Sequence, residues 1–361
     1  MGISVLVVDD SVVVRRLVTL ALEAEEGIDV VGVAANGQIA LAKVAQLAPD
    51  VVTMDVEMPV LDGIATVRAL RAAGHRMPVI MFSTLTERGA SATLDALAAG
   101  ATDYVTKPTG HASVQEAVER VASDLVPRIR ALVGRRSAAL PAPRAGAAAP
   151  SAPRRPALRI LTAPERGQVR AVVVGASTGG PEALSHLVRG LGALSVPVVV
   201  VQHMPPVFTT QLAARLDRLG DADVVEAGGG QALAPGTVHV APGDHHLELV
   251  RSGAVVRTRL HQGPAVNYCR PSVDVLFRSA AAVYGRDLLA VVLTGMGSDG
   301  RSGVEAVLAA GGRVIAQDEA TSVVWGMPGA VATGPGAHAV LPLPEVAPAV
   351  VRAVTRAGVP A

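Results

Sequence analysis

The chain has 361 residues, of which 50% are hydrophobic and 17% are charged, so it can fill two buried cores and is not disordered throughout. A formal net charge of +1 and an aromatic share of 2% argue against nucleic-acid binding. Cys269 is the only cysteine, which excludes an intramolecular disulfide and a metal site built from several cysteines.

The N-terminal sequence MGISVLVVDD lacks the basic region of a signal peptide. No apolar run of the chain reaches the ~18 residues that are needed to cross a bilayer. We therefore expect a cytoplasmic protein with no direct membrane insertion.

Residues 1–124 alternate short apolar runs with helical stretches. A helix is predicted to start after the N-cap residue Ser11 and to stop near Gly27. Runs that are apolar throughout are typical of strands that are buried on both faces of a parallel sheet. The predicted strands are residues 4–8, 30–33, 51–54, 79–82 and 104–106, which together make one doubly wound α/β domain.

Polar side chains follow the ends of these strands. Asp9 and Asp10 follow the first strand, Asp55 the third, Ser83 the fourth and Lys107 the fifth. The carboxyl ends of parallel strands share one edge of the sheet, and three carboxylates gathered there need a cation such as Mg²⁺. With Lys107 and Ser83 to hold phosphoryl oxygens, this set suits phosphoryl transfer to Asp55. The alternative is an acidic edge that is only solvated.

The motifs VVDD, TMDVEMP, MFST and DYVTKP at these strand ends resemble the receiver domain of two-component response regulators. The resemblance implies a flavodoxin-like fold and Mg²⁺-dependent phosphorylation by a histidine kinase. The implied site residues are the phospho-acceptor Asp55, the Mg²⁺ ligands Asp9, Asp10 and Asp55, the switch residues Ser83 and Tyr104, and Lys107 beside the phosphoryl group.

The composition changes after this domain. Residues 125–164 contain eight arginines and no acidic residue, and residues 141–156 are almost only Pro, Ala, Arg, Gly and Ser. This composition predicts a flexible, partly extended linker over residues 125–168. Its arginines are interpreted as solubilising, with contact to an acidic partner or to lipid as the alternative.

The alternation of strands and helices resumes at residue 169 and predicts a second doubly wound α/β domain over residues 169–358. A hairpin of residues 246–250 and 254–259, joined by residues 251–253, is expected to form an antiparallel addition. The other predicted strands are residues 171–175, 197–202, 237–241, 288–294 and 313–317.

A glycine-rich turn follows the first of these strands. Residues 175–179, GASTG, fit the G-x-S-x-G pattern, in which a tight turn lifts the Ser177 hydroxyl above the sheet edge. Backbone N–H groups at the start of the next helix, including that of Thr178, suit the stabilisation of an oxyanion. The turn lacks G-x-G-x-x-G and Gly-Lys-Ser/Thr, which argues against a dinucleotide site and a P-loop.

A serine nucleophile needs a general base and an orienting acid. His203 follows strand 197–202 and Asp299 follows strand 288–294, so both are expected at the edge that carries Ser177. The chain order Ser…His…Asp differs from the Ser…Asp…His order of ordinary α/β-hydrolases. The rival candidates are His245 and His246 as bases and Asp274 and Asp318 as acids.

This order resembles the catalytic domain of the CheB family of chemotaxis methylesterases, as do GASTGGPEAL, QHMP, CRPSVDVLF, LTGMGSDG and AQDEATSVVWGMP. The resemblance covers about residues 170–356, and a receiver, a linker and this domain make up the family's architecture. It implies demethylation of glutamate methyl esters and deamidation of glutamines on chemoreceptors, with a chemotaxis histidine kinase as phosphodonor. It also implies that Ser177, His203 and Asp299 are catalytic, that the Met296 amide helps to hold the oxyanion, and that the catalytic domain needs no cofactor.

Three other functional classes are considered. An oxidoreductase that uses GASTGG as a nucleotide turn gives no role to His203 or Asp299, and a transcription factor needs a basic helix-turn-helix, which is not found. The main alternative is a non-catalytic response regulator whose second domain binds a partner. The Ser/His/Asp set argues against it, and methanol release from a methylated receptor distinguishes the two.

Overall fold

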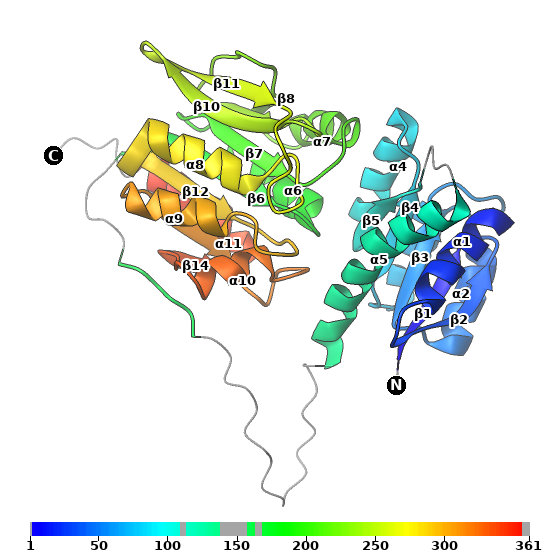
Figure 1. The fold of residues 1–361 in the computed structure, drawn as a ribbon. Helices are drawn as coiled ribbons and strands as arrows, with labels where there is room; N and C mark the ends of the chain where they lie inside the picture. The colour runs from blue at the N-terminus through cyan, green and yellow to red at the C-terminus, as the bar shows by residue number, and fades with distance from the viewer. Residues whose placement is uncertain (1, 109–112, 138–156, 163–167, 356–361) are drawn as a thin grey trace, which may run out of the picture. The chain divides into compact units, whose positions relative to one another are not determined.

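The computed structural model describes residues 2–108, 113–137, 157–162 and 168–355. The chain divides into two compact units, Met1–Ala148 and Ala149–Ala361 (Figure 1). None of the helices in the described residues has the length and apolar character of a membrane span.

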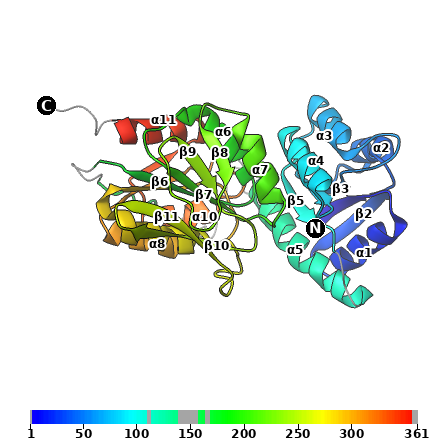
Figure 2. The same ribbon diagram turned by 90° about the horizontal axis from the view of Figure 1, so that it is seen from above.

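The first unit is a five-stranded parallel sheet between two layers of helices. Its strands are β1 (Ile3–Val8), β2 (Ile28–Ala34), β3 (Val51–Asp55), β4 (Val79–Ser83) and β5 (Asp103–Thr106), in the order β2-β1-β3-β4-β5. Its helices are α1 (Val12–Glu23), α2 (Gly37–Leu47), α3 (Gly63–Ala72), α4 (Glu87–Ala98) and α5 (Val114–Ser137). Helices α1 and α5 cover one face of the sheet, and α2, α3 and α4 cover the other (Figure 2).

The sequence explains these elements locally. Every residue of β3 and β4 is buried, as expected for strands covered on both faces. The side chain of Ser11 accepts a hydrogen bond from the Val14 amide, so it caps α1 as predicted. The predicted fold class is confirmed for this unit.

Helix α5 corrects part of the predicted linker. The helix continues to Ser137, so residues 125–137 are helical rather than extended. The physical reason is an apolar stripe at helical spacing, formed by Leu125, Ile129 and Leu132, which are buried although arginines lie between them. Residues 138–156 and 163–167 of the predicted linker lie outside the described part of the chain.

A short described segment, residues 157–162, belongs to the second unit. Ile160 forms a parallel bridge with Ala337, and the Arg159 amide donates to the Ala332 carbonyl over 2.7 Å. The end of the predicted linker is therefore attached to the second unit by backbone hydrogen bonds.

The second unit contains a seven-stranded parallel sheet in the order β14-β13-β12-β6-β7-β9-β8. The strands are β6 (Ala171–Ala176), β7 (Val198–Gln202), β8 (Asp223–Glu226), β9 (Thr237–Val240), β12 (Leu288–Val292), β13 (Arg313–Gln317) and β14 (Ala339–Leu341). The sequence analysis missed β8 and β14: in β8 a charged residue stands at each end of two valines, and β14 is only three residues long.

Helices cover both faces of this sheet. Helices α6 (Gly180–Leu191), α7 (Phe208–Asp217) and α11 (Leu343–Thr355) lie on one face, and α8 (Val273–Tyr284) and α9 (Arg301–Ala309) lie on the other (Figures 1 and 2). The short helix α10 (Met327–Ala332) contacts α9 and β13, and one 3₁₀ turn, η1 (Gly285–Asp287), leads into β12. A doubly wound α/β domain is confirmed.

The predicted antiparallel addition is a separate two-stranded sheet of β10 (His246–Ser252) and β11 (Val255–His261), which packs against α8. The turn is shorter than predicted, because Ser252 pairs with Val255 and only Gly253 and Ala254 lie between them. Gly253 has a φ of +61°, a conformation that glycine adopts without strain.

Each parallel sheet has one pair of neighbouring strands from which the connections run in opposite directions. In the first sheet this pair is β1 and β3, and in the second it is β6 and β12. Open α/β sheets bind ligands in the crevice at this switch point, beyond the carboxyl ends of the strands. The residues that follow these four strands therefore define two candidate sites.

Candidate functional sites

The first site lies at the carboxyl ends of β1 and β3. Asp9 and Asp55 are buried and Asp10 is exposed, and their carboxylate oxygens lie within 4.8 Å of one another. Lys107, after β5, places its Nζ 2.9 Å from the Oδ2 atoms of both Asp9 and Asp55. The structure therefore brings together the four charged residues that the sequence placed at this edge.

The electrostatics of this site are those of crowded carboxylates. Burial raises the pKa of Asp55 to about 6; the Asp9 carboxylate adds to this rise, and the hydrogen bond from Lys107 opposes it. Burial alone would lower the pKa of Lys107, but its hydrogen bonds to Asp55 and Asp9 raise it. The ammonium group stays charged and offsets only part of the negative charge.

This donor set fits a hard divalent cation. The three clustered side chains all offer carboxylate oxygens, one of them is exposed, and the Lys107 ammonium faces the two buried carboxylates. Mg²⁺ prefers oxygen ligands and keeps several waters, for which an exposed edge leaves room.

The two predicted switch residues lie on β4 and β5, the strands on the Lys107 side of β3. Ser83 ends β4, where its carbonyl accepts a hydrogen bond from the Lys107 amide, and its hydroxyl donates to the Gly89 carbonyl over 3.1 Å. Tyr104 is buried on β5, and burial raises the pKa of its phenol. Their switch roles stay predictions.

The second site begins with two adjacent strand ends. Residues Ala176 of β6 and Gln202 of β7 pair in register, so Ser177 and His203 follow neighbouring strands. The His203 amide donates to the Ala176 carbonyl over 3.1 Å, and the Ser177 amide donates to the Thr294 carbonyl over 3.0 Å. These bonds fix the backbone of both residues at the carboxyl ends of β6 and β7, next to the switch point.

Small residues allow close packing around Ser177. A Cβ added at Gly295 would lie 2.9 Å from the Ser177 Cβ, and one at Gly180 would lie 1.9 Å from the Gln202 Oε1. Gly179, the N-cap of α6, has a φ of +75°. The tight turn predicted from GASTGG therefore depends on these glycines.

Gln202 supports the turn and was missed by the sequence analysis. Its buried amide nitrogen Nε2 donates to the carbonyl of Ser177 over 3.0 Å and to that of His203 over 3.3 Å. The available signal was a polar residue at the end of an otherwise all-valine strand. A buried amide there indicates a hydrogen-bonding task.

His203 forms a pair with Asp299, with 2.8 Å between Nε2 and Oδ2. The ring therefore uses Nε2 toward the acid, which leaves Nδ1 as the nitrogen that accepts a proton. In this structure Nδ1 faces the Cys269 Sγ at 3.5 Å. Within the described residues, no hydrogen bond joins the Ser177 hydroxyl to the ring, so proton transfer requires a local rearrangement.

The pair is strongly polarised. Burial alone would lower the pKa of His203, but the hydrogen bond to Asp299 and the contact with Cys269 raise it to about 9. Burial opposes ionisation of Asp299, but His203 and then Asn267 hold its pKa at about 2. Asp299 therefore keeps its negative charge throughout the neutral range.

Asp299 and Asp274 each cap the other's helix. Asp299, which precedes α9, accepts hydrogen bonds from the amides of Val273 and Asp274 at the start of α8. Asp274, in the first turn of α8, accepts from the amides of Gly300 and Gly303 at the start of α9. The free N–H groups of two helix starts thus stabilise two buried carboxylates.

The side chains of His203, Cys269 and Asp299 place possible metal-ligand atoms within 4.8 Å of one another. However, both Asp299 oxygens already accept hydrogen bonds from neighbouring protein groups. A carboxylate whose lone pairs are used in this way suits an orienting role better than metal ligation.

The rival candidates are engaged elsewhere. His246 uses one ring nitrogen toward the Pro264 carbonyl and accepts from the Ser272 amide at the other. His245 contacts the Gly243 carbonyl, and Asp318 accepts hydrogen bonds from Thr321. Asp274 serves as the helix cap described above.

The two predicted oxyanion donors lie at this edge. Thr178 is buried at the turn into α6, where its carbonyl accepts a hydrogen bond from the Thr294 hydroxyl over 2.9 Å. The Met296 N–H has no hydrogen-bond partner among the described residues. A free N–H beside the serine turn suits an oxyanion.

Comparisons with known proteins agree with these two sites. The family model described as response regulator receiver domain matches residues 5–119, and the CheB methylesterase model matches residues 172–350. A relative in Nocardioides sp., called protein-glutamate methylesterase/protein-glutamine glutaminase, is 59% identical over 355 residues, which are 98% of this chain and 96% of the relative.

A relative of the same name in Trichodesmium erythraeum is 45% identical over 351 residues, which are 97% of this chain and 98% of the relative. The crystal structure of the Thermotoga maritima CheB methylesterase catalytic domain is 42% identical, with a TM-score of 0.50. The match covers 52% of this chain and 98% of the chain in that crystal structure.

Proposed function

This chain belongs to the CheB methylesterase family, and from this membership we propose how its two sites work together. The chain is a protein-glutamate methylesterase and protein-glutamine glutaminase that carries a receiver domain. Its proposed substrates are chemoreceptors, its proposed phosphodonor is a chemotaxis histidine kinase, and the cytoplasm is the expected compartment.

In the proposed reaction, Ser177 is the nucleophile and His203 the general base. The serine oxygen attacks the side-chain carbonyl of a glutamate methyl ester, and its proton moves to His203 Nδ1, because Nε2 is committed to Asp299. The protonated base then gives this proton to the leaving methoxide, and methanol departs. Water hydrolyses the acyl-enzyme and restores glutamate.

A glutamine side chain presents the same carbonyl with an amide nitrogen as the leaving group. The same steps then release ammonia instead of methanol, so one site performs both reactions. We assign the backbone amides of Thr178 and Met296 to the oxyanion that forms in each step. Donors fixed in place before the reaction stabilise this charge without reorganisation.

One observation carries this proposal: a polarised base–acid pair lies directly beside the serine turn at the switch point. Nε2 of His203 is 2.8 Å from Asp299, and Ser177 follows the neighbouring, hydrogen-bonded strand. The Ser/His/Asp roles account for these contacts, whereas a second domain that only binds a partner would not need a buried imidazole polarised by a carboxylate.

In the receiver, we assign Asp55 as the phospho-acceptor and Asp9, Asp10 and Asp55 as the Mg²⁺ ligands. The cation, when bound, neutralises negative charge on the phosphoryl oxygens. Lys107 already contacts two of the carboxylates and would offer its ammonium group to the phosphoryl oxygens.

We further propose that phosphorylation of Asp55 changes the state of the two buried switch residues, Ser83 and Tyr104, and thereby activates the esterase. A phosphoryl group adds about −1.5 to −2 charges at this edge. A coupling free energy of about 1–3 kcal/mol between the two domains would change activity about 5–150-fold.

The test is methanol release from a methylated chemoreceptor by the full chain. Ser177→Ala is expected to lower kcat by on the order of 10⁶, as for a comparable triad, while circular dichroism remains unchanged. Ser252→Ala, an exposed serine of the β10–β11 hairpin, is the matched control and should retain full activity. Retention of activity within tenfold in Ser177→Ala would contradict the nucleophile assignment.

A further inference from the structure

The loop between β11 and α8 reaches over the base–acid pair. Val266 and Cys269 exchange two backbone hydrogen bonds, of 3.1 and 2.9 Å, which close a tight turn. Asn267 and Tyr268 at its tip have φ values of 51° and 63°. Residues other than glycine rarely adopt this left-handed backbone conformation, so contacts with the surroundings must hold the turn in place.

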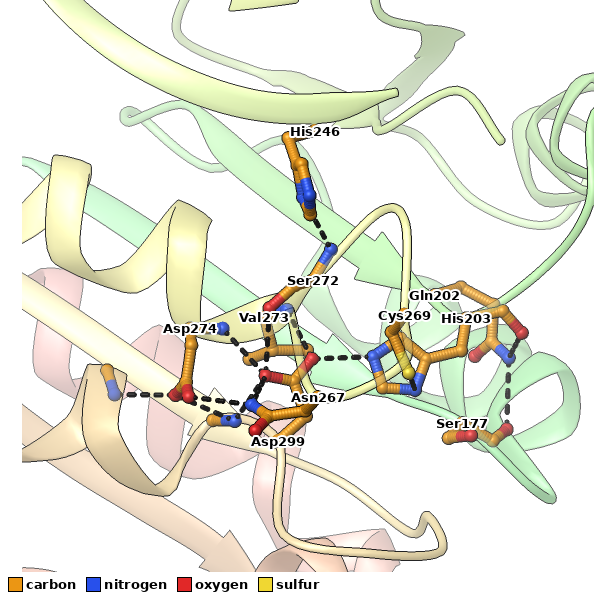
Figure 3. A network of polar contacts seen from close by, with 12 residues as sticks. Ser177, Gln202, His203, His246, Asn267, Cys269, Ser272, Val273, Asp274 and Asp299 are labelled. Carbon is orange, nitrogen blue, oxygen red and sulfur yellow. Dashed lines mark hydrogen bonds and ion pairs between the residues drawn. The ribbon is translucent and has the colours of Figure 1, made fainter. Parts of the chain in front are cut away.

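Asn267 anchors this loop to the orienting acid. Its Nδ2 donates to Oδ1 of Asp299 and to Oδ2 of Asp274, each over 2.9 Å, and so bridges the two buried carboxylates (Figure 3). Hydrogen bonds to charged groups are about twice as strong as neutral ones. The loop is therefore locked to the acid, whereas the neighbouring Tyr268 side chain is fully exposed.

This anchoring places the thiol of Cys269 against His203. Its Sγ lies 3.5 Å from Nδ1, on the side of the ring away from Asp299 (Figure 3). The raised pKa of His203 favours the protonated ring at neutral pH, in which Nε2–H donates to Asp299 and Nδ1–H donates to the Cys269 Sγ. The imidazole is thus held at both nitrogens, by the acid on one side and by the thiol on the other.

We propose that Cys269 is a positioning residue for the general base: it holds Nδ1 of His203 in the resting enzyme and yields this nitrogen to the Ser177 hydroxyl when the substrate binds. The proposal rests on the proposed base role of His203. A thiol suits this task because sulfur is a weak hydrogen-bond acceptor. It orients the protonated ring, and once the ring is neutral the serine O–H can take its place at Nδ1 at little cost.

The surroundings of His203 make this role measurable through pH. The ionisable groups in contact with the ring are Asp299, from the loop after β12, and Cys269, from the loop before α8. Asp274 and His246 lie further out, behind Asn267 and Ser272. The thiol contact contributes to the raised pKa of the ring, so its removal should lower that pKa.

The experiment measures kcat/KM for methanol release between pH 5 and pH 10 with the full chain. In Cys269→Ala, the rise of activity with pH is expected to move to lower pH, and the plateau to fall about threefold to tenfold, as for the loss of one hydrogen bond. Cys269→Ser keeps a hydrogen-bond acceptor at this place and should retain the wild-type midpoint. Tyr268→Phe, on the same loop, is the control and should match the wild type.

Alkylation with iodoacetamide provides a second measurement that needs no Cys269→Ala protein. It should inactivate the wild-type chain and leave Cys269→Ser active, and equal inactivation of both would overturn the proposal. An unchanged midpoint and plateau in Cys269→Ala, or a higher plateau, would also overturn it. Activity in Ser177→Ala would instead contradict the proposed function, so the two failures are distinguishable.

Discussion

The two sites of this chain occupy equivalent places in their sheets but treat a buried carboxylate in opposite ways. Burial raises the pKa of Asp55 to about 6, whereas Asp299, also buried, has its pKa held at about 2. Asp55 shares its site with other carboxylates and one Lys107, while Asp299 receives hydrogen bonds from an imidazole, an amide side chain and two helix starts. The donors around a carboxylate, and not its burial, decide whether its charge is stable.

This difference matches the two proposed chemistries. A carboxylate that lacks sufficient positive charge suits a site that takes up a cation and a phosphoryl group. A carboxylate whose hydrogen bonds are complete suits an orienter, whose charge must remain constant while the neighbouring imidazole gains and loses a proton.

Of the two contrasted carboxylates, Asp299 is expected to give the larger effect. Asp299→Asn keeps the shape but removes the charge, so kcat for methanol release should fall about 10⁴-fold, as for a comparable triad. The pKa of His203 should also fall, because the hydrogen bond to Asp299 raises it. Asp318→Asn, at the rival acid, is the control, and a fall of less than tenfold in Asp299→Asn would show that the orienting charge is not needed.

The next effect concerns Asp55. Asp55→Asn should abolish the stimulation of the esterase by a small-molecule phosphodonor, expected at about 5–150-fold, and should leave the unstimulated rate unchanged. Glu57→Gln, an exposed neighbour that pairs with Arg88, should respond like the wild type. Stimulation that persists in Asp55→Asn would place the phosphorylation site elsewhere.

Mg²⁺ separates the two sites directly. At 100 times its Kd, bound Mg²⁺ should stabilise the first unit by ~2.7 kcal/mol, which corresponds to a rise of several degrees in the Tm of its transition in calorimetry of the full chain. Chelation with EDTA should reverse the shift, and Asp10→Asn should reduce it. The transition of the second unit should not move, because Asp299 has no free lone pair for a cation.

The pH dependence of the esterase tests the polarised pair. The general base must be neutral, so kcat/KM should rise with pH through the pKa of His203, with a midpoint above the ordinary value of 6.5 and toward about 9. A midpoint at or below 6.5 would show that Asp299 does not hold the imidazolium form.

The smallest effect is on stability. The raised pKa of His203 contributes stability that is fully present below pH 6.5 and is lost as the pH rises through about 9. The lowered pKa of Asp299 contributes stability that is present above pH 3.8 and is lost as the pH falls toward about 2. The free energy of unfolding of the second unit, measured with urea, should therefore fall by on the order of 1–3 kcal/mol between pH 6 and pH 10. An equal loss in His203→Gln would assign it to other groups.

Sequence reasoning predicted the residues that follow strands, because all parallel strands deliver their carboxyl ends to one edge. Ser177, His203 and Asp299 were found in this way, and so were the receiver carboxylates. Of the residues it missed at the second site, Gln202 ends a strand and could have been found. Asn267 and Cys269 reach the site from a loop beyond an antiparallel hairpin, and nothing local in the sequence indicates where that loop folds back.

The composition of residues 125–137 led to a wrong prediction, because it suggested an extended linker where the chain forms the end of α5. The arginines of residues 125–137 hid the apolar stripe that buries α5, and only the spacing of Leu125, Ile129 and Leu132 carried the signal. The exchange of caps between α8 and α9 was also beyond reach, because Asp274 and Asp299 meet only after both helices have packed together.

Because of that exchange of caps, Asp299 has two tasks: it caps the start of α8 and it contacts the His203 ring. A substitution that removes the carboxylate takes away the proposed orienting charge, and it also removes the acceptor that caps the start of α8. Few substitutions at this position can therefore remove the charge and still leave a well-folded chain. Asparagine comes nearest in shape, and smaller or apolar residues leave amide groups buried without a partner. In this part of the molecule, keeping the fold and keeping the chemistry are one and the same constraint.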